Sequence, residues 1–309
     1  MARAYIFDYI EVFYNQTHWY NHLGAPDQRN HKPNSMTTAS VLLSVYHRES
    51  ADTLNTCMQS LVDQTRMPGR IILVRDGPLN SELETVIEKF ANMWPELFQM
   101  VNLPENRGLT SALNEGLRRC TTDYVLRMDA DDIAAPERFE RQLAFVEDNP
   151  DVAVLGTAMW EFVDHPGEAR LKPVKESHAE IVRQLPWRNP VNHATVCYRT
   201  EAIKQAGGYP ELPLLEDYFL WAKVIKAGYR LHNLPEALYY CRFDDATLGR
   251  RAGWQNFKNE CSLRLWMYRH GLVRLPTLLG AITIQFALRF SPTKLQRRLW
   301  RATRRQVDS

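Results

Sequence analysis

The feature that most constrains the fold is a regular alternation between residues 40 and 156. Short apolar, β-branched runs alternate there with longer segments of helical period. Five runs are predicted as strands: Val41 to Tyr46, Ile71 to Arg75, Gln99 to Asn102, Tyr124 to Met128 and Val152 to Leu155. A helix is expected from Pro136, because proline at a first turn lacks only an amide that would be unpaired there. The pattern predicts an α/β fold with an open, mostly parallel sheet and flanking helices.

Composition limits the class of protein. The chain has 309 residues, of which 45% are hydrophobic, so it can bury a full core. The formal net charge is only +2, which gives no general attraction to nucleic acid, and we expect no nucleic-acid partner. Five cysteines without a CxxC pair argue against a disulfide framework and a structural zinc site. No signal peptide pattern and no apolar run of about 20 residues is found, so we expect a cytoplasmic protein.

Three regions are expected: residues 1–37, a catalytic domain over residues 38–245, and a helical, basic region over residues 246–309. The string RAYIFDYIEVFYNQTHWYNHLG, residues 3–24, resembles the tail of integrase-type transposases encoded by insertion sequences. In such proteins the catalytic carboxylates precede this tail, so the segment is expected to carry no chemistry. Met36 is then the natural start of the second protein. The alternative is an ordinary amphipathic leader helix.

The C-terminal region has a composition of its own. Between Arg250 and Ser309 there are thirteen basic residues against two acidic ones, Glu260 and Asp308. The apolar segment from Leu272 to Phe290 is broken by polar residues and is followed by a strongly basic one. Apolar area beside basic side chains is typical of an interfacial anchor, so we expect peripheral contact with the cytoplasmic membrane. The alternative is a solvated basic helix that closes the catalytic domain.

Acidic residues follow the fourth predicted strand. The sequence LRMDADD places Asp129, Asp131 and Asp132 in one turn, at the edge of the sheet where ligands bind in open α/β folds. Three such acids repel one another unless a cation lies among them. Mn²⁺ or Mg²⁺ suits carboxylate oxygens and commonly binds through one or two carboxylates plus substrate phosphates. The alternative is a polar turn in which Asp132 caps the next helix.

The same edge receives polar residues from neighbouring strands. Asp76 follows the second strand, Asn106 and Arg107 precede a helix, and the first strand supplies Ser44 and Tyr46. Together these groups can meet a nucleobase and ribose. Taken alone, the sequence from Asp76 to Pro78 is an ordinary turn.

Further along, Glu216 and Asp217 begin an amphipathic helix. Paired acids at a helix N-terminus are often present only because they interact favourably with the helix dipole.

Several runs carry a family resemblance: SVLLSVYHRE, QSLVDQT, IILVRDG, ENRGLTSALNEGL and YVLRMDADDIAAPERFERQ. Over about residues 40–242 the chain resembles the family 2 glycosyltransferases of the GT-A fold. Within that family it is most similar to enzymes of exopolysaccharide or lipopolysaccharide synthesis, of the amylovoran and colanic-acid type. One departure concerns the second strand, after which many members carry two acids and a serine. This chain has Arg75, Asp76, Gly77 and Pro78 there.

The resemblance implies roles for particular residues. Asp76 would contact the base or ribose of a UDP-type donor, Asp129 would lie near the donor sugar, and Asp131 would hold the metal. Asp217 matches the general base. The run RNPVNHATVCYR resembles a segment that faces the donor sugar and metal, which makes Asn189 and His193 candidates. The alternative for His193 is a structural histidine.

The implied activity is an inverting transfer from a nucleotide sugar to a saccharide, or to a lipid-linked saccharide at the inner face of the membrane. A sugar nucleotidyltransferase is one rival, but it would need a glycine-rich, basic loop after the first strand, and the sequence from Tyr46 to Glu49 is not one. A non-catalytic DNA-binding fusion product is the other rival.

Overall fold

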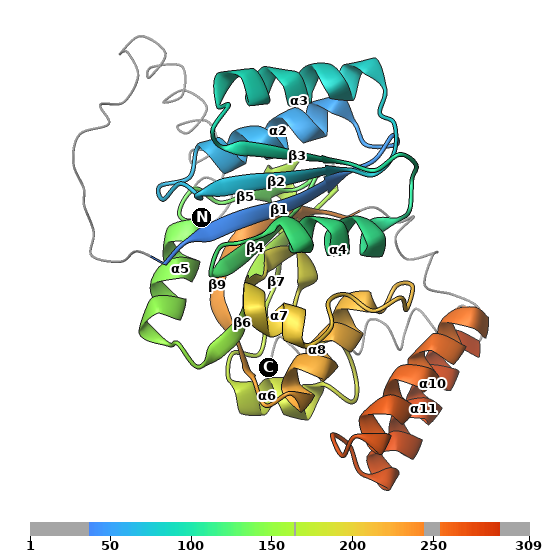
Figure 1. Ribbon diagram of the computed structural model, residues 1–309. Coiled ribbons are helices and arrows are strands. Elements are labelled where there is room, and N and C mark those ends of the chain that lie inside the picture. The colour runs from blue at the N-terminus through green and yellow to red at the C-terminus, as the bar shows by residue number, and fades with distance from the viewer. Residues whose placement is uncertain (1–36, 164, 244–253, 291–309) are drawn as a thin grey trace.

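The computed structural model describes residues 37–163, 165–243 and 254–290. Nine strands form one sheet, in which eight follow the order β3-β2-β1-β4-β8-β6-β9-β5 and β7 pairs with β6 (Figure 1). The strands are β1 (Ala39–Val45), β2 (Arg70–Arg75), β3 (Phe98–Asn102), β4 (Tyr124–Asp129), β5 (Ile133–Ala134), β6 (Val152–Phe162), β7 (Arg170–Lys172), β8 (Cys197–Arg199) and β9 (Arg230–Arg242).

The sheet is mostly parallel, as predicted. Strands β1 to β4 are parallel to one another, and β8 joins β4 and β6 in the antiparallel direction, so β6 runs the same way as β4. Strand β9 is parallel to β6, and the short strands β5 and β7 pair in the antiparallel direction with β9 and β6, respectively. The three antiparallel strands, β5, β7 and β8, have only two or three residues each and were not predicted.

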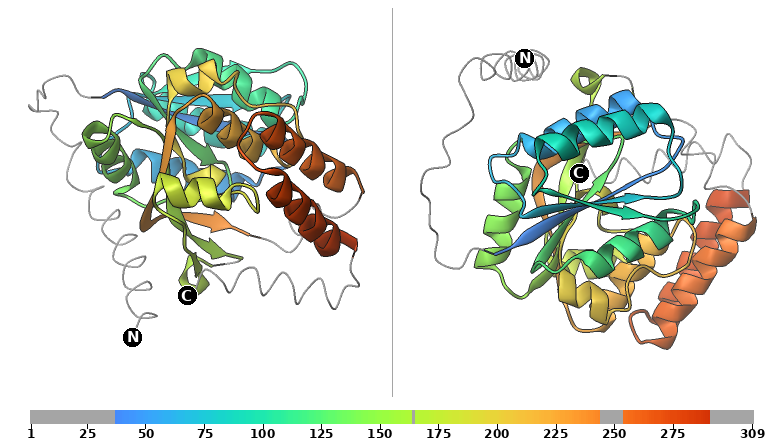
Figure 2. Two further views of the ribbon diagram at one scale, coloured as in Figure 1. Left: turned by 90° about the horizontal axis from the view of Figure 1, so that it is seen from below. Right: turned by 45° about the horizontal axis from the view of Figure 1, so that its top comes forward.

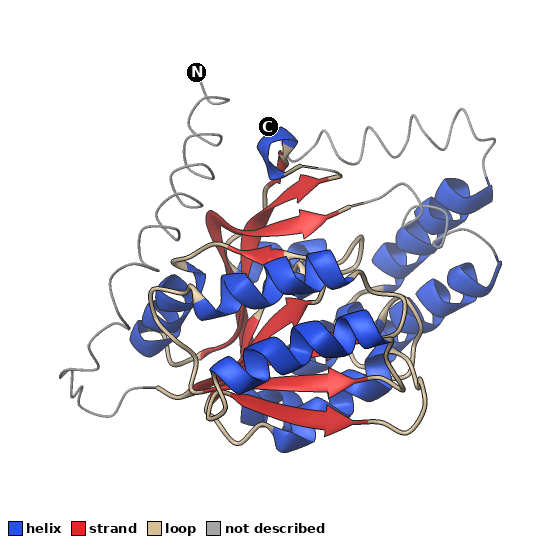
Figure 3. Cartoon of the chain, turned by 90° about the horizontal axis from the view of Figure 1, so that it is seen from above, coloured by secondary structure: helices blue, strands red, loops and turns tan. Residues whose placement is uncertain are grey.

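Helices cover both faces of the sheet (Figure 3). They are α2 (Ala51–Val62), α3 (Ser81–Met93), α4 (Leu109–Arg119), α5 (Arg138–Asp148), α6 (His178–Gln184), α7 (Thr200–Gln205), α8 (Glu216–Lys226), α10 (Trp254–Arg269) and α11 (Leu275–Phe290), with short 3₁₀ turns at Pro166–Glu168 and His193–Thr195. Helices α2, α3 and α5 pack on one face, and α4, α7 and α8 pack on the other.

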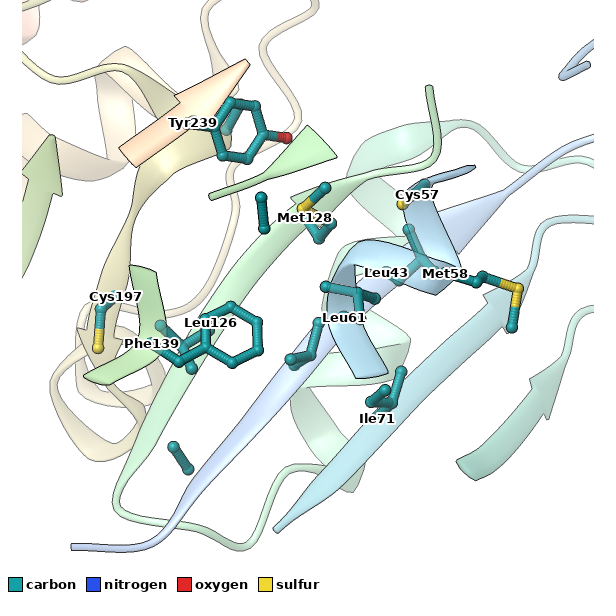
Figure 4. Packing of buried hydrophobic residues seen from close by; sticks show 14 of the residues in the cluster. Leu43, Cys57, Met58, Leu61, Ile71, Leu126, Met128, Phe139, Cys197 and Tyr239 are labelled. Carbon is teal, nitrogen blue, oxygen red and sulfur yellow. The ribbon is translucent and has the colours of Figure 1, made fainter. Parts of the chain in front are cut away.

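Alternation along β1 separates the two layers. Val41, Leu43 and Val45 join the cluster under α2, while Leu42 joins the cluster under α4. This is the period of two that a strand buried on both faces requires. Figure 4 shows the first cluster, in which α2 lays its apolar side chains over the strands.

The five predicted strands are confirmed, although β6 continues to Phe162. The helix predicted from Pro136 was placed two residues early, because α5 begins at Arg138. The Arg138 amide donates to the carbonyl of Ala135 at 3.0 Å, which closes a turn around Pro136 before the helix.

Helices α10 and α11 form a hairpin beside α8 (Figure 2). Leu263, Met267 and Leu278 of the hairpin pack against Tyr218 and Ala222 of α8. The part of the C-terminal region that the structure describes is helical, as predicted. None of its helices, nor any other in the described ranges, is long and apolar enough to cross a bilayer. The segment resembling a transposase and the basic residues beyond Phe290 lie outside the described residues.

Candidate active site

The carboxyl ends of β1, β2 and β4 meet at one edge of the sheet, as parallel strands require (Figure 1). Ser44 is the register partner of Asp129 across β1 and β4, so these two predicted site residues are neighbours. Tyr46 follows β1, is half-buried, and meets His47 edge-on with ring centroids 5.7 Å apart. The edge therefore presents a hydroxyl, an aromatic ring and a carboxylate next to one another.

A buried arginine lies beneath Asp129. Arg127 and Asp129 are two residues apart on β4, so their side chains leave the same face of the sheet. The Arg127 guanidinium is 2% exposed and contacts the Asp129 carboxylate, which is itself one-third exposed. Because an unpaired buried charge is costly, this contact holds both groups in place. The amide of Asp129 also donates to the hydroxyl of Tyr239 at 3.1 Å.

Asp131 and Asp132 occupy different positions in the turn. Asp132 is 2% exposed, and its carboxylate accepts the amide of Arg242 at 2.6 Å, which ties the turn to the end of β9. Asp132 therefore contacts β9 and does not cap a helix. Burial, followed by the charge of Asp129, raises the pKa of Asp131 to about 6, while Arg127 and Arg242 oppose this shift. The turn thus concentrates more negative charge than its cations balance.

Sequence reasoning missed Glu49. It lies in the loop between β1 and α2, and burial, followed by the charges of Asp131 and Asp129, raises its pKa to about 7. Glu49 is thereby a fourth carboxyl group in the field of the acid turn. A signal was available, since Glu49 stands three residues beyond Tyr46 at the carboxyl end of β1.

The acid turn fits a divalent cation that completes its shell with substrate. Within the described ranges, no group of three or more His, Cys, Asp or Glu side chains forms a ready-made cage for an ion. Mn²⁺ and Mg²⁺ commonly bind through one or two carboxylates plus phosphate oxygens, and Asp131 offers such a ligand beside excess negative charge. The donor set and the charge therefore agree with the metal predicted from the sequence.

Asp76 fastens a neighbouring loop. It is 3% exposed, and its two carboxylate oxygens accept the amides of Arg107 at 2.7 Å and Gly108 at 2.9 Å. The side-chain amide of Asn106 donates to the carbonyl of Asp76 at 3.3 Å. A side chain at Gly77 would meet the Asn106 backbone at 2.5 Å, so only glycine permits this approach. The predicted donor residues Asp76, Asn106 and Arg107 are thus brought together, with Asn106 and Arg107 exposed.

Asp217 lies at the start of α8, where the sequence predicted it. Its carboxylate accepts the side-chain amide of Asn189 at 2.5 Å and its own helix's Tyr218 amide at 2.7 Å. Burial, followed by the charge of Asp217, raises the pKa of the adjacent Glu216. The structure therefore joins Asn189, Glu216 and Asp217 in one group.

Arg127 connects this group to the acid turn electrostatically. Its charge opposes the rise in the pKa of Glu216, as it does for Asp131. Asp131 of the acid turn and Glu216 of α8 thus both lie in the electrostatic field of one buried cation. A base on one side and a stabiliser of a leaving group on the other is the arrangement that a displacement requires.

His193 is held by a hydrogen-bonding partner. Its Nε2 lies 3.0 Å from the hydroxyl of Tyr209, and its ring packs near Trp221 at 6.2 Å between centroids. Burial, followed by the charge of Arg127, lowers the pKa of His193 well below its usual range. The imidazole is neutral, and the nitrogen that contacts Tyr209 is occupied by that hydrogen bond.

The segment from Leu185 to Asn189 connects Asp217 with the C-terminal hairpin. Arg264 of α10 donates to the carbonyls of Pro186 at 3.1 Å and Trp187 at 3.3 Å. Arg264 is 1% exposed and forms an ion pair with Glu260. The hairpin therefore fixes the backbone two residues before Asn189.

Comparison with known proteins defines the family. The family model described as glycosyl transferase family 2 matches residues 40–206. An uncharacterised glycosyltransferase of Haemophilus influenzae is 40% identical over 84% of this chain and 97% of its own length. The chain belongs to glycosyltransferase family 2. It is a glycosyltransferase with the GT-A fold, which removes the support for a nucleotidyltransferase and for a non-catalytic fusion product.

Other relatives of this family 2 glycosyltransferase have more specific names. The amylovoran biosynthesis glycosyltransferase AmsE of Erwinia amylovora is 39% identical over 76% of this chain and 88% of its own. The UDP-Gal:alpha-D-GlcNAc-diphosphoundecaprenol beta-1,3-galactosyltransferase of Escherichia coli is 32% identical, with coverages of 83% and 93%. Relatives of this chain therefore include enzymes of exopolysaccharide synthesis and of sugar transfer to a lipid-linked precursor.

Solved structures agree on the fold. Staphylococcus aureus TarS residues 1–349 in complex with UDP-GlcNAc superposes with a TM-score of 0.62 at 19% identity, over 81% of this chain and 73% of that one. The chain covers 45% of the longer TarS structure. A mannosyltransferase of Pyrobaculum calidifontis in complex with GDP-Man and Mn²⁺ gives a TM-score of 0.54 at 17% identity, over 95% and 86%.

Proposed function

We propose that this glycosyltransferase moves a sugar from a UDP-sugar to a growing, lipid-linked surface polysaccharide, with inversion at the anomeric carbon. The observation that supports the proposal is the charge of Arg127, which acts on Asp131 of the acid turn and on Glu216, the neighbour of Asp217, while Asn189 donates a hydrogen bond to Asp217. The names of the relatives support the class of donor and acceptor.

The donor would lie along the edge formed by β1, β2 and β4. Ser44, Tyr46 and the loop clamped by Asp76 surround the space for the base and ribose, with Asn106 and Arg107 exposed toward solvent. The carboxylate of Asp129, fixed by Arg127, would meet the ribose or the donor sugar. Asp131 would hold a divalent cation together with the oxygens of the diphosphate. The cation would neutralise charge on the leaving group.

The transfer is a single displacement. The acceptor hydroxyl gives its proton to the carboxylate of Asp217 while its oxygen bonds to the anomeric carbon. The bond from that carbon to the diphosphate oxygen breaks, and the nucleoside diphosphate leaves from the opposite face. Asn189 donates to Asp217 Oδ2 at 2.5 Å and so fixes the orientation of the carboxylate that serves as the base. No covalent nucleophile is required.

A lipid-linked acceptor places the enzyme at the inner face of the cytoplasmic membrane. The C-terminal region would provide peripheral contact, since its sequence combines apolar and basic residues.

Two substitutions test the assignment because a metal ligand and a base act on different substrates. Asp131→Ala should lose Mn²⁺-dependent binding of UDP, because the diphosphate then approaches the remaining acids of the turn without a cation between them. Asp217→Asn should keep the affinity for UDP within a few-fold while transfer falls by about 10² to 10⁴. Calorimetric titration with UDP and Mn²⁺, together with a transfer assay, measures both effects.

Glu216→Gln is the matched control, since it removes the adjacent carboxylate from the same helix turn. It should reduce transfer much less than Asp217→Asn does. If Asp217→Asn lost UDP binding as fully as Asp131→Ala, Asp217 would belong to the donor site, and Glu216 would become the candidate base.

A further inference from the structure

Aromatic side chains gather where α10 begins and α11 ends. The aromatic end, as we name it, comprises Trp254, Phe257, Phe286 and Phe290. Ring centroids of Trp254 and Phe290 are 5.7 Å apart, those of Phe257 and Phe286 are 5.7 Å apart, and those of Phe286 and Phe290 are 4.8 Å apart. Trp254 and Phe286 are 56% and 51% exposed. Four large rings thus pack against one another and still face solvent.

An apolar stripe continues from the aromatic end along α11. Leu275 and Leu279 are 50% and 57% exposed, and Phe286 and Phe290 follow at seven and eleven residues beyond Leu279. These spacings place all four side chains on one face of the helix. A neighbouring face of α11, through Leu278, packs toward α8. The helix is therefore apolar on two faces, and only one of them is covered by the described part of the chain.

Charge indicates what covers the exposed side. Glu260 is the only acid in the sequences of α10 and α11, and it is buried in its pair with Arg264. The Lys258 ammonium lies 5.9 Å from the Trp254 ring. The sequence after Phe290 adds six basic residues and one acid: Lys294, Arg297, Arg298, Arg301, Arg304, Arg305 and Asp308. A second copy of this chain would bring like charges together, whereas an anionic lipid surface complements them.

We infer that the aromatic end and the apolar stripe of α11 form the surface with which the enzyme lies on an anionic bilayer. Aromatic rings favour the boundary between headgroups and acyl chains, and basic side chains beside them attract anionic headgroups. The inference rests on the proposed function, which requires a lipid-linked acceptor. It adds the orientation, because the covered side of the same hairpin packs against the helix that bears Asp217.

Co-sedimentation of the full chain with lipid vesicles tests this surface. Vesicles of phosphatidylglycerol and phosphatidylethanolamine should bind the protein, and phosphatidylcholine vesicles should bind it less. Phe286→Glu should weaken binding to the anionic vesicles by about 10-fold or more, because a ring that enters the interface is replaced by a charge. High salt should weaken the binding of the wild type.

Met93→Glu is the matched control, because Met93 ends α3 and is 59% exposed. It adds the same charge to another exposed apolar position and should change vesicle binding by no more than about twofold. Thermal unfolding of both variants shows whether they remain folded. Equal losses in both variants would overturn the inference, as would a concentration-dependent dimer, in the absence of lipid, that Phe286→Glu abolishes.

Vesicle binding needs neither donor nor turnover, so the two proposals can fail separately. Binding through Phe286 without sugar transfer would leave the membrane surface standing and contradict the proposed function. Transfer to a lipid-linked acceptor without any effect of Phe286→Glu on vesicle binding would support the proposed function and contradict the membrane surface.

Discussion

Glu49 and the acid turn bring several carboxyl groups close to one another at the end of the sheet. Burial and mutual repulsion raise the pKa values of Glu49 and Asp131. The charge of Arg127, which pairs with Asp129, offsets part of the repulsion at Asp131. Such sites bind cations because the folded protein holds negative charge together at a cost in stability. The cost can be measured at Glu49.

Glu49→Gln should stabilise the protein at pH 8 in the presence of a chelator. The pKa of Glu49 rises from 4.5 to about 7 on folding, so its ionised form opposes the folded state. This penalty is absent below pH 4.5, grows between 4.5 and about 7, and is complete above that. We expect a gain of about 1–2 kcal/mol at pH 8, after allowance for the exposed part of the side chain, and none at pH 4.5.

Thermal or urea unfolding at the two pH values measures this gain. Glu88→Gln, at an exposed position of α3, is the control and should have no effect at either pH. An equal gain at both pH values for Glu49→Gln would mean that repulsion is not the cause.

Sequence reasoning located the acids that stand directly after strands, because parallel strands bring their carboxyl ends to one edge. It could not assign the roles. Asp132 and Asp76 are aspartates that follow strands as Asp131 does, yet their carboxylates accept amides of β9 and of the loop before α4. Such contacts depend on long-range pairing that no local pattern contains. Glu49 escaped notice for the same reason, since its neighbours are far away in the sequence.

Segment 185–189 is the element that joins the base to the hairpin. Asn189 at one end contacts Asp217, and Pro186 and Trp187 at the other accept hydrogen bonds from Arg264. Gln285 of α11 also donates to the carbonyl of Trp187, at 3.4 Å. The position of the base therefore depends on helices that hold none of the site residues.

Arg264→Met should lower the turnover number while leaving the affinity for UDP within about twofold. The single substitution also leaves Glu260 buried without its partner, which costs about 3–5 kcal/mol of stability. Glu260→Met combined with Arg264→Met removes both charges and should recover most of that stability. Turnover should stay low in the double variant, since Pro186 and Trp187 still lack the hydrogen bonds from Arg264. Recovery of turnover together with stability would contradict a positioning role for Arg264.

Elements with a long, regular pattern were predictable, and short ones were not. Strands β1 to β4 and helix α8 follow clear apolar periods. Strand β8 has three residues and β5 has two, and no periodicity can identify so short a run. They are the strands that run against the others, so the sequence predicted the parallel strands and missed the antiparallel ones.

The whole molecule divides by role along the chain. The residues proposed to bind the donor come from the first half of the sheet, and the proposed base comes from α8, beyond β8. Near the start of the first described range, Thr38 donates to Asp123 through its amide at 3.0 Å and its hydroxyl at 2.8 Å.

Deletion of residues 1–35 should leave the unfolding temperature and the turnover number unchanged, because Thr38 and Asp123 already close the first strand. Scanning calorimetry and a transfer assay on the shortened chain measure both. A drop in unfolding temperature would show that the deleted segment packs on the catalytic domain.

The thiol of Cys57 lies directly under the acid turn. Its Sγ donates to the carbonyl of Asp129 at 3.2 Å, the side chain is fully buried, and burial, followed by the charge of Asp132, raises its pKa well above the usual range. Such a thiol is unreactive toward alkylating reagents as long as α2 packs against the turn. A reagent can alkylate Cys57 only after the acid turn and α2 have separated locally. The rate of alkylation therefore reports how readily this part of the site opens.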